Sequence, residues 1–289
     1  MTMRDIRHPS APATRPPAGA TDCHMHAYFA PSERPTDAAA AFPPVPHGSI
    51  DNYLQVQKQL GLARAVVVQP SVYGFDNAPT LAAMAALGEN GRGVAVVPPD
   101  VPDAELERLT ALGVRGVRFF MLSGGALPWD CLPGLAARVA RFGWHVQLQT
   151  DGRSLADHAA VLRALPCRLV IDHNGKFLAP VEPTHAGFRT LLELVDRGNT
   201  WVKTSGVYET SLEGAPDYAD VAVLARKLID TAPERCLFAT NWPHPTKPAA
   251  PPDDGHLIDL FMQWCGNAQT AARIMVDNAA EVYGFERAT

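Results

Sequence analysis

The chain has 289 residues, of which 47% are hydrophobic and 19% charged, and its 25 basic and 30 acidic residues give a net charge of -5. This composition is typical of an ordinary globular protein, and a mildly acidic balance without a run of like charges argues against a nucleic-acid or membrane partner. No apolar stretch approaches the ~18 residues that a membrane span needs, and residues 1–19 lack the apolar region of a signal peptide.

The five cysteines are scattered, odd in number and without a C-x-x-C pair. We therefore expect reduced thiols and a cytoplasmic protein. Residues 1–19 are rich in proline and alanine, which predicts a disordered or surface-draped segment ahead of one folded domain over residues 20–289.

Eight short β-rich runs recur about every 31 residues, with helical patterns between most of them. This is the pitch of a repeated strand-helix unit and predicts an α/β fold, a single-domain (β/α)8 TIM barrel. A doubly wound open sheet is the alternative, but no glycine-rich phosphate loop follows the first run. The predicted strands are Ala20–Cys23, Ala65–Gln69, Gly93–Val97, Gly116–Phe120, His145–Gln149, Leu169–Asp172, Trp201–Thr204 and Leu237–Thr240.

Several of the intervening helical patterns end at a glycine suited to a C-cap, namely Gly113, Gly143 and Gly198. Two proline-rich tracts, residues 30–48 and 243–252, are too long for minimal turns and should form lids or walls over the barrel mouth. The predicted helices are Pro79–Gly88, Asp103–Leu112, Leu132–Phe142, Ser154–Leu165, Ala186–Asp196 and Tyr218–Ile229, with a tail helix near Ala268–Val282 that closes the barrel.

The first predicted strand carries Asp22, His24 and His26 at alternate positions. Because side chains alternate along a strand, these three should share one face and point into the barrel. Polar side chains at the carboxyl end of a barrel strand lie where such barrels keep their active sites. The alternative is a pair of surface loop histidines.

The fifth strand repeats this pattern with His145, Gln147, Gln149 and Asp151. Amides and a carboxylate inside a barrel cost desolvation unless hydrogen bonds satisfy them. We assign Gln149 and Asp151 to the site, with a polar plug lower in the barrel as the alternative.

The sixth strand ends at His173, which is a candidate electrophile or base because it shares its level with the two histidines of the first strand. Lys176 follows in the loop, where it is either a substrate contact or a solvated charge. Arg118, near the end of the fourth strand, suits a substrate carboxylate. An internal salt bridge with Asp151 or Asp22 is equally open.

The last two strands lead into Tyr208, which we expect to wall or hydrogen-bond a substrate, and into the segment Asn241, Trp242, Pro243 and His244.

The His-x-His pair, the histidine that ends the sixth strand and the terminal Trp-Pro-His segment together resemble the amidohydrolase superfamily, over Thr21 to Asn278. The run Asp172 to Lys176 and the Asn-Trp-Pro-His segment look like its metal-independent lactonase branch, which includes 2-pyrone-4,6-dicarboxylate lactonase and D-galactarolactone isomerase. The resemblance implies that the histidines polarise a carbonyl and that Arg118 binds a carboxylate. The strand-eight position usually holds aspartate, whereas Asn241 cannot take a proton from water and is a poor metal ligand.

We therefore expect an enzyme that attacks the acyl carbonyl of a sugar-acid lactone and isomerises it, without metal or other cofactor. The alternatives are a lactone hydrolase, a divalent-metal hydrolase or decarboxylase that uses the three histidines as ligands, and a barrel that only binds its ligand. A homo-oligomer also stays open. The expected catalytic residues are His24, His26, His173, Asn241 and Asp151, and the expected substrate-binding residues are Arg118, Gln149, Lys176, Tyr208, Trp242 and His244.

Overall fold

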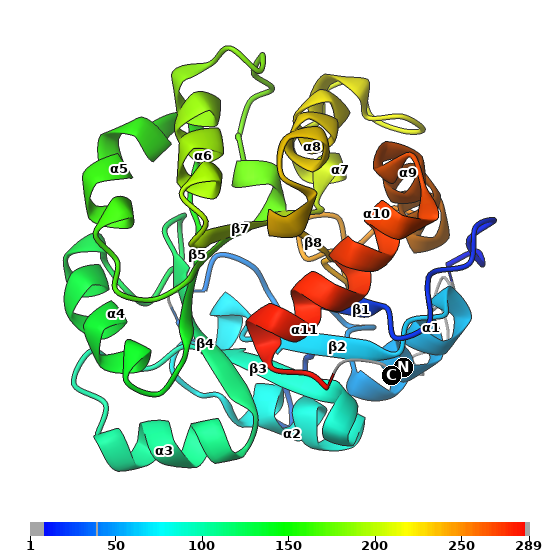
Figure 1. Cartoon of the computed structure of the whole chain (residues 1–289). Helices are drawn as coiled ribbons and strands as arrows, with labels where there is room; N and C mark the ends of the chain where they lie inside the picture. Colours follow the sequence, from blue (N-terminus) through cyan, green and yellow to red (C-terminus); the bar gives the residue numbers. More distant parts are fainter. Residues whose placement is uncertain (1–8, 39, 287–289) are drawn as a thin grey trace.

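Eight parallel strands follow one another in chain order around a single sheet in the computed structural model, which describes residues 9–38 and 40–286. A parallel bridge between Met25 and Trp242 brings the last strand back to the first. The backbone N–H of His26 also donates to the carbonyl of Trp242 at 2.8 Å. Helices surround the strands (Figure 1). The predicted (β/α)8 barrel is confirmed.

All eight predicted strands are present, and each begins and ends within two residues of its predicted bounds. They are β1 (Thr21–Met25), β2 (Arg64–Val68), β3 (Gly91–Ala95), β4 (Val114–Phe120), β5 (His145–Gln149), β6 (Leu169–Ile171), β7 (Thr200–Thr204) and β8 (Cys236–Phe238).

The six predicted inter-strand helices and the tail helix are also present, and the predicted C-cap glycines have the positive φ that this role requires. Three helices were not predicted: α1 and α9, whose N-caps Ser49 and Asp253 directly follow the two proline-rich tracts, and the short α7. The helices are α1 (Ile50–Leu60), α2 (Ala78–Leu87), α3 (Asp103–Ala111), α4 (Leu132–Ala140), α5 (Leu155–Arg163), α6 (Ala186–Asp196), α7 (Val207–Thr210), α8 (Ala219–Thr231), α9 (Asp254–Cys265), α10 (Ala268–Ala272) and α11 (Asn278–Tyr283).

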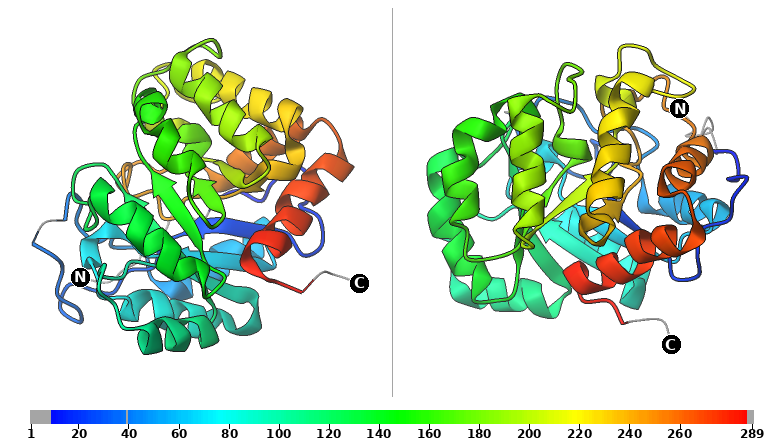
Figure 2. Two further views of the ribbon diagram at one scale, coloured as in Figure 1. Left: turned by 60° about the vertical axis from the view of Figure 1, so that its left-hand side comes forward. Right: turned by 45° about the horizontal axis from the view of Figure 1, so that its top comes forward.

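The tail helix closes one end of the barrel. A π-helical turn, Arg273–Asp277, joins α10 to α11. Apolar side chains of α11, including Ala279 and Tyr283, pack in one buried cluster with the inward-facing Cys23 and Val66. The helix crosses in front of the strands in Figure 1 and lies at the barrel's rim in both views of Figure 2. The carboxyl ends of the strands are thus left as the open mouth.

The first strand departs from the predicted alternation. Asp22 pairs with Ala65 but Met25 pairs with Val67, so β1 holds one residue more than β2 over this stretch. This bulge turns Cys23 inward, while the Asp22 carboxylate binds the hydroxyl of Tyr53 on α1. The prediction that Asp22 shares the inner face with His24 was therefore wrong.

The amino-terminal segment lies along the surface where it is described. The backbone N–H of Ser10 donates to Asp253, and those of Ala13 and Thr14 donate to Asp259 on α9. The first eight residues of the predicted segment lie outside the described residues.

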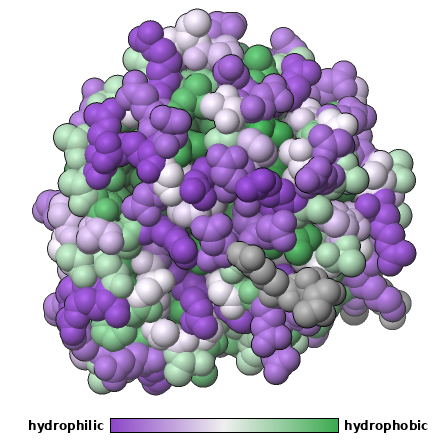
Figure 3. Space-filling model, viewed as in Figure 1, coloured by the Kyte–Doolittle hydropathy of each residue, from purple (hydrophilic) through white to green (hydrophobic). Residues whose placement is uncertain are grey.

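The outer surface in the view of Figure 3 is mostly hydrophilic, with small scattered apolar areas. Within residues 9–38 and 40–286, no helix is both long and apolar enough to cross a bilayer. All five cysteines are free thiols, as predicted.

Candidate active site

A cavity of about 370 Å³ opens at the carboxyl ends of the strands. Apolar side chains and polar or charged side chains both line it, a combination that suits a small-molecule site. Both proline-rich tracts contribute, through Ala41 and Phe42 and through Pro245 and Thr246, as predicted. The polar and charged lining side chains are His26, Ser71, Arg118, Ser123, Gln149, His173, Lys176, Glu209, Asn241 and Thr246.

The two histidines of the first strand are bonded to each other. Nε2 of His24 lies 3.1 Å from Nε2 of His26, and Nδ1 of His26 lies 2.7 Å from the carbonyl oxygen of Val68. A carbonyl only accepts, so His26 carries its proton on Nδ1 and its Nε2 accepts from His24. Burial is the main cause that holds the pKa of His24 well below its usual value and lowers that of His26 to about 3. Both rings are therefore neutral at neutral pH, and both nitrogens of His26 are already engaged.

Lys203 completes this arrangement from β7. Its ammonium lies 3.2 Å from Nδ1 of His24, 3.3 Å from Oδ1 of Asp172 and 2.6 Å from Oε1 of Gln147. Gln147 in turn donates to Oδ2 of Asp172 at 3.0 Å. Burial alone would raise the pKa of Asp172, but the charge of Lys203, then of other neighbours, outweighs it and the pKa is lowered. Lys203 and Asp172 thus form a fully buried ion pair beneath the cavity floor.

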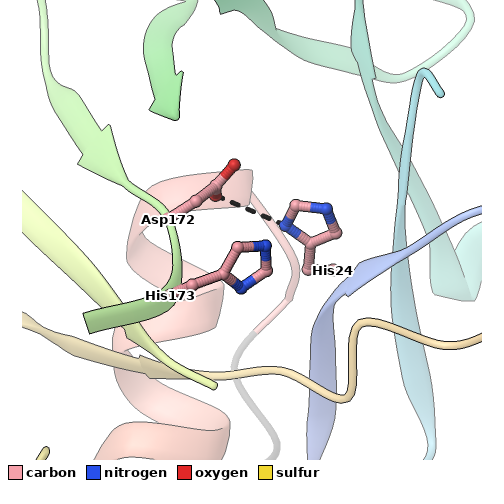
Figure 4. Close-up of side chains that lie close together, drawn as sticks. All are labelled: His24, Asp172 and His173. Atoms are coloured by element: carbon pink, nitrogen blue, oxygen red, sulfur yellow. Dashed lines mark ion pairs between the residues drawn. The ribbon is translucent and has the colours of Figure 1, made fainter. Parts of the chain in front are cut away.

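Among the three histidines of this cluster, His173 lines the cavity and keeps one ring nitrogen without a partner among the described residues. Its Nδ1 lies 2.9 Å from the Ser205 hydroxyl, and its ring centroid is 4.8 Å from that of His24. Figure 4 shows His24, Asp172 and His173 pointing toward one another. Burial, as the largest cause, lowers the pKa of His173 well below its usual value. When Ser205 donates to Nδ1, the neutral ring presents Nε2–H, a donor suited to a carbonyl oxygen that gains negative charge.

Gly206 makes room for this ring. Its φ is +67°, which L side chains rarely adopt, and a Cβ there would lie 3.0 Å from Cγ and Nδ1 of His173. A side chain at position 206 would therefore strain the backbone and press on the ring.

Arg118 carries a positive charge that no acidic side chain of the described residues pairs. Its guanidinium donates to the carbonyl of Gln69 at 2.7 Å and to Oε1 of Gln149 at 3.0 Å, and its buried Nε has no partner among the described residues. The internal salt bridges left open above do not form, because Asp151 pairs with Arg153 and Asp22 with Thr240. A positive group held by neutral acceptors in a cavity suits an anionic ligand.

A second cation at the cavity is already neutralised. Lys176 forms a buried ion pair with Glu209, and the other carboxylate oxygen of Glu209 accepts from the Thr246 hydroxyl at 2.9 Å. Lys176 had been predicted at the site, whereas Glu209 had not. Arg118 therefore remains the uncompensated charge of this lining.

Asn241 follows β8 and lines the cavity, with its backbone N–H donating to the carbonyl of His24 at 2.8 Å. Its side-chain nitrogen lies 2.8 Å from the hydroxyl of Tyr208, which lies 2.9 Å from Nδ1 of His244. Tyr208 and His244 are buried behind Asn241 and do not line the cavity. We had expected Tyr208 and His244 to contact the substrate, whereas in the structure they lie behind Asn241, which lines the cavity.

Two further predicted residues lie away from the cavity. Asp151 does not continue the inward pattern of β5, because the strand ends at Gln149 and Asp151 caps the following turn, where it accepts from the backbone and side chain of Arg153. Trp242 packs on the outer side of the barrel wall, 5.3 Å from the ring of Tyr53 and 6.3 Å from that of His47. Neither is brought together with the histidines.

The backbone is unusual where the site is built. Positive φ values at non-glycine residues occur at His173, Asn174, Lys176, Asn241 and His244, and at one described position elsewhere, Tyr218. Such residues cost about 1–3 kcal/mol each and tend to gather at functional sites. The strained loops after β6 and β8 face the same cavity.

Three described side chains have ligand atoms close enough for a metal ion, namely His24, Asp172 and His173, within 4.8 Å of one another. The donor set does not fit a divalent cation as it stands. The Lys203 ammonium already contacts both Nδ1 of His24 and Oδ1 of Asp172, and Nε2 of His24 is engaged by His26. A cation would have to displace one of these groups.

Comparison with known proteins gives consistent matches over nearly the whole chain. A family model described as "Amidohydrolase" matches residues 21–285. D-galactarolactone isomerase of Agrobacterium fabrum is 35% identical over 282 residues, which cover 96% of each chain. A 2-pyrone-4,6-dicarboxylate hydrolase of Comamonas testosteroni is 33% identical over 286 residues, which cover 96% of this chain and 93% of that protein. An apo crystal structure from Agrobacterium tumefaciens superposes with a TM-score of 0.89 at 33% identity, covering 96% of this chain and 100% of that one.

Proposed function

The chain belongs to the amidohydrolase family and is an enzyme of the lactone isomerase or lactone hydrolase type, and we propose that its reaction is the isomerisation of a sugar-acid lactone without a metal ion. The substrate class is a small lactone that bears one carboxylate and several hydroxyls, as in D-galactaro-1,5-lactone. The observation that carries this choice is Asn241, an amide at the strand-eight position of a cavity that also holds one unpaired cation.

The carboxylate of the substrate binds Arg118 in this proposal. The free Nε of its guanidinium and its position on the cavity wall support that role. Gln149, whose Oε1 accepts from Arg118, keeps its NH2 group for a hydroxyl of the substrate. Because Lys176 is already paired with Glu209, the lining offers one net positive charge, which suits one carboxylate better than two.

His173 acts on the lactone carbonyl. A neutral imidazole that donates through Nε2 stabilises the oxyanion of a tetrahedral intermediate and does not need to lose or gain a proton. His24 packs against the ring of His173, and the nitrogens of His24 and His26 are held by each other, by Lys203 and by Val68.

The attacking group is a ring hydroxyl of the substrate. Its oxygen forms a bond to the lactone carbon, the bond from that carbon to the ring oxygen breaks, and the hydroxyl proton passes to the departing alkoxide. Intramolecular attack has an effective molarity that reaches about 10⁵ M or more, so it proceeds with a weaker base than hydrolysis does. The amide of Asn241 can accept a hydrogen bond from the hydroxyl but cannot take its proton.

Hydrolysis of a lactone is the second candidate, and Glu209 is the observation that favours it. This carboxylate lines the cavity and could assist a water molecule if it exchanged Lys176 or Thr246 for that water.

The test is incubation of metal-depleted protein with freshly prepared D-galactaro-1,5-lactone, followed by ¹³C NMR and a pH-stat. The proposal predicts enzyme-dependent appearance of the 1,4-lactone without acid release, above a buffer blank. Stoichiometric acid with open-chain galactarate would instead establish a hydrolase. Activity that is lost on chelation and restored by one equivalent of a divalent metal would contradict the metal-free part of the proposal.

A further inference from the structure

A chain of four buried polar side chains runs from the cavity into the protein behind β8. It consists of Asn241, Tyr208 on α7, His244 in the loop after β8, and Asp254 at the start of α9. Successive polar atoms lie 2.8, 2.9 and 3.1 Å apart. Asn241 alone of these four lines the cavity, whereas Tyr208, His244 and Asp254 are 6%, 2% and 3% exposed.

With the His244 ring neutral, its pairing with Asp254 sets the direction of every hydrogen bond in this chain. The Asp254 carboxylate can only accept, so Nε2 of His244 carries a proton. In the neutral ring Nδ1 then accepts, and it must take the proton of the Tyr208 hydroxyl. The Tyr208 oxygen is left as an acceptor, so it is the NH2 group of Asn241 that faces it.

With a neutral His244, these bonds place the NH2 group of Asn241 toward Tyr208, an assignment that the heavy-atom positions of an asparagine do not give by themselves. A flipped Asn241 would bring its carbonyl oxygen against an oxygen whose proton is already given to His244. Burial, then the charge of Glu209, raises the pKa of Tyr208 well above its usual value, so the phenol keeps the proton that the arrangement needs.

We propose that Tyr208, His244 and Asp254 are positioning residues that hold the Asn241 carboxamide with Oδ1 toward the cavity, where it accepts a hydrogen bond from the attacking hydroxyl of the substrate. The orientation rests on the four side chains with His244 in its neutral form. The role toward the hydroxyl rests on the proposed function, in which the proton of that hydroxyl ends on the departing ring oxygen and none is released.

A double-mutant cycle in lactone turnover tests whether Tyr208 acts through Asn241. Tyr208→Phe keeps the ring and removes the hydroxyl, and we expect kcat to fall about 10- to 100-fold, since small misplacements of reacting groups have losses of this size. KM should change less than kcat. In an Asn241→Ala background the same Tyr208→Phe change should cause no further fall in kcat. Losses that multiply would overturn the proposal, because they would show that Tyr208 acts on its own.

The matched control is Tyr218→Phe. Tyr218 is 7% exposed and belongs to the same apolar cluster as Tyr208, but the structure gives its hydroxyl no bond to the chain of four. This variant should keep wild-type kcat and KM, so it reports the cost of removing a buried phenol hydroxyl in that cluster.

A second readout does not depend on turnover. The chain has eight asparagines, so [¹⁵N]asparagine labelling gives a small set of side-chain NH2 signals, of which that of Asn241 is the one lost in Asn241→Ala. Tyr208→Phe and His244→Ala should both shift this NH2 signal, and Tyr218→Phe should not. An Asn241 signal that neither variant moves would overturn the orientation, whatever the enzyme does. Shifts as expected in a protein that leaves lactones unchanged would instead reject the proposed function and retain the orientation.

Discussion

The ammonium of Lys203 lies 3.2 Å from Nδ1 of His24, inside the barrel and without solvent exposure. The same ammonium is 3.3 Å from Asp172, so one cation neutralises a buried carboxylate and, after burial, is the next cause that keeps His24 neutral. The proton of His24 is thereby directed to Nε2 and toward His26. Lys203, Asp172 and Gln147 thus form a buried polar cluster beneath the cavity floor that contains its own cation.

Lys203→Met should be strongly destabilising, because it leaves Asp172 charged and buried without its partner. We expect the free energy of unfolding to fall by about 3–5 kcal/mol, measured by urea denaturation. Lys203→Met combined with Asp172→Asn should recover a large part of this loss, and the exposed Lys227→Met should change stability by less than about 0.5 kcal/mol. A double variant no more stable than Lys203→Met alone would show that the pair is not the source of the effect.

Stability should depend on the neutrality of the buried histidines. The pKa of His26 is lowered to about 3, so the unfolded state binds a proton near pH 6.5 that the folded state refuses until about pH 3. Its contribution is therefore complete above pH 6.5 and is lost as pH falls toward 3, by up to about 1.4 kcal/mol per pH unit.

The measurement compares wild type with His26→Gln, whose side chain does not titrate. The advantage of wild type in unfolding free energy should shrink between pH 7 and pH 5. His145→Gln should behave likewise, since burial also lowers the pKa of His145 to about 3 and that residue lies away from the cavity. Parallel stability curves for wild type and both variants would contradict this account.

Arg118 should contribute mainly to substrate binding. Arg118→Met is expected to raise KM for a carboxylate-bearing lactone about 10- to 100-fold, because a charge-assisted hydrogen bond to an anion is worth about 1.5–3 kcal/mol. For a lactone of the same ring in which CH2OH replaces the carboxylate, the change in KM should be much smaller. Equal effects on both lactones would mean that Arg118 does not bind the carboxylate.

The sequence alone predicts the fold of this molecule better than the details of its site. The spacing of the β-rich runs predicted all eight strands, because a strand-helix repeat has one favoured closed arrangement. The face of Asp22 could not be predicted, since a bulge in β1 is a matter of strand pairing. Asp151 and Trp242 were misplaced because the strand ends before one and the chain turns outward at the other.

Lys203 and Glu209 show what one sequence leaves hidden. The role of each depends on an ion-pair partner from another strand or loop. Lys203 pairs with Asp172, and Glu209 pairs with Lys176. A lysine inside a predicted strand, alternating with Trp201 and next to a strand that ends in Asp172, was a usable signal for the first pair. No local sequence pattern predicted the hydrogen-bonded side chains from Asn241 to Asp254. Their arrangement depends on α7 and α9, two helices that were not predicted.

The amide at position 241 should decide between the two reactions. Asn241→Asp introduces a group that can take a proton from water, so we expect part of the turnover to shift from the 1,4-lactone to the open-chain acid. The product ratio by NMR measures this directly, and Asn241→Ala is the control that removes the amide without adding a base. A ratio unchanged in the aspartate variant would mean that position 241 does not govern the nucleophile.

The central claim is that a hydroxyl of the substrate, and not water, attacks the lactone carbonyl. Its most direct test is turnover of D-galactaro-1,5-lactone in H2¹⁸O, with the product analysed by mass spectrometry at early times against an enzyme-free blank. The account predicts a 1,4-lactone that carries no ¹⁸O above the blank. An enzyme-dependent product with one ¹⁸O atom in a carboxylate would contradict it and establish attack by water.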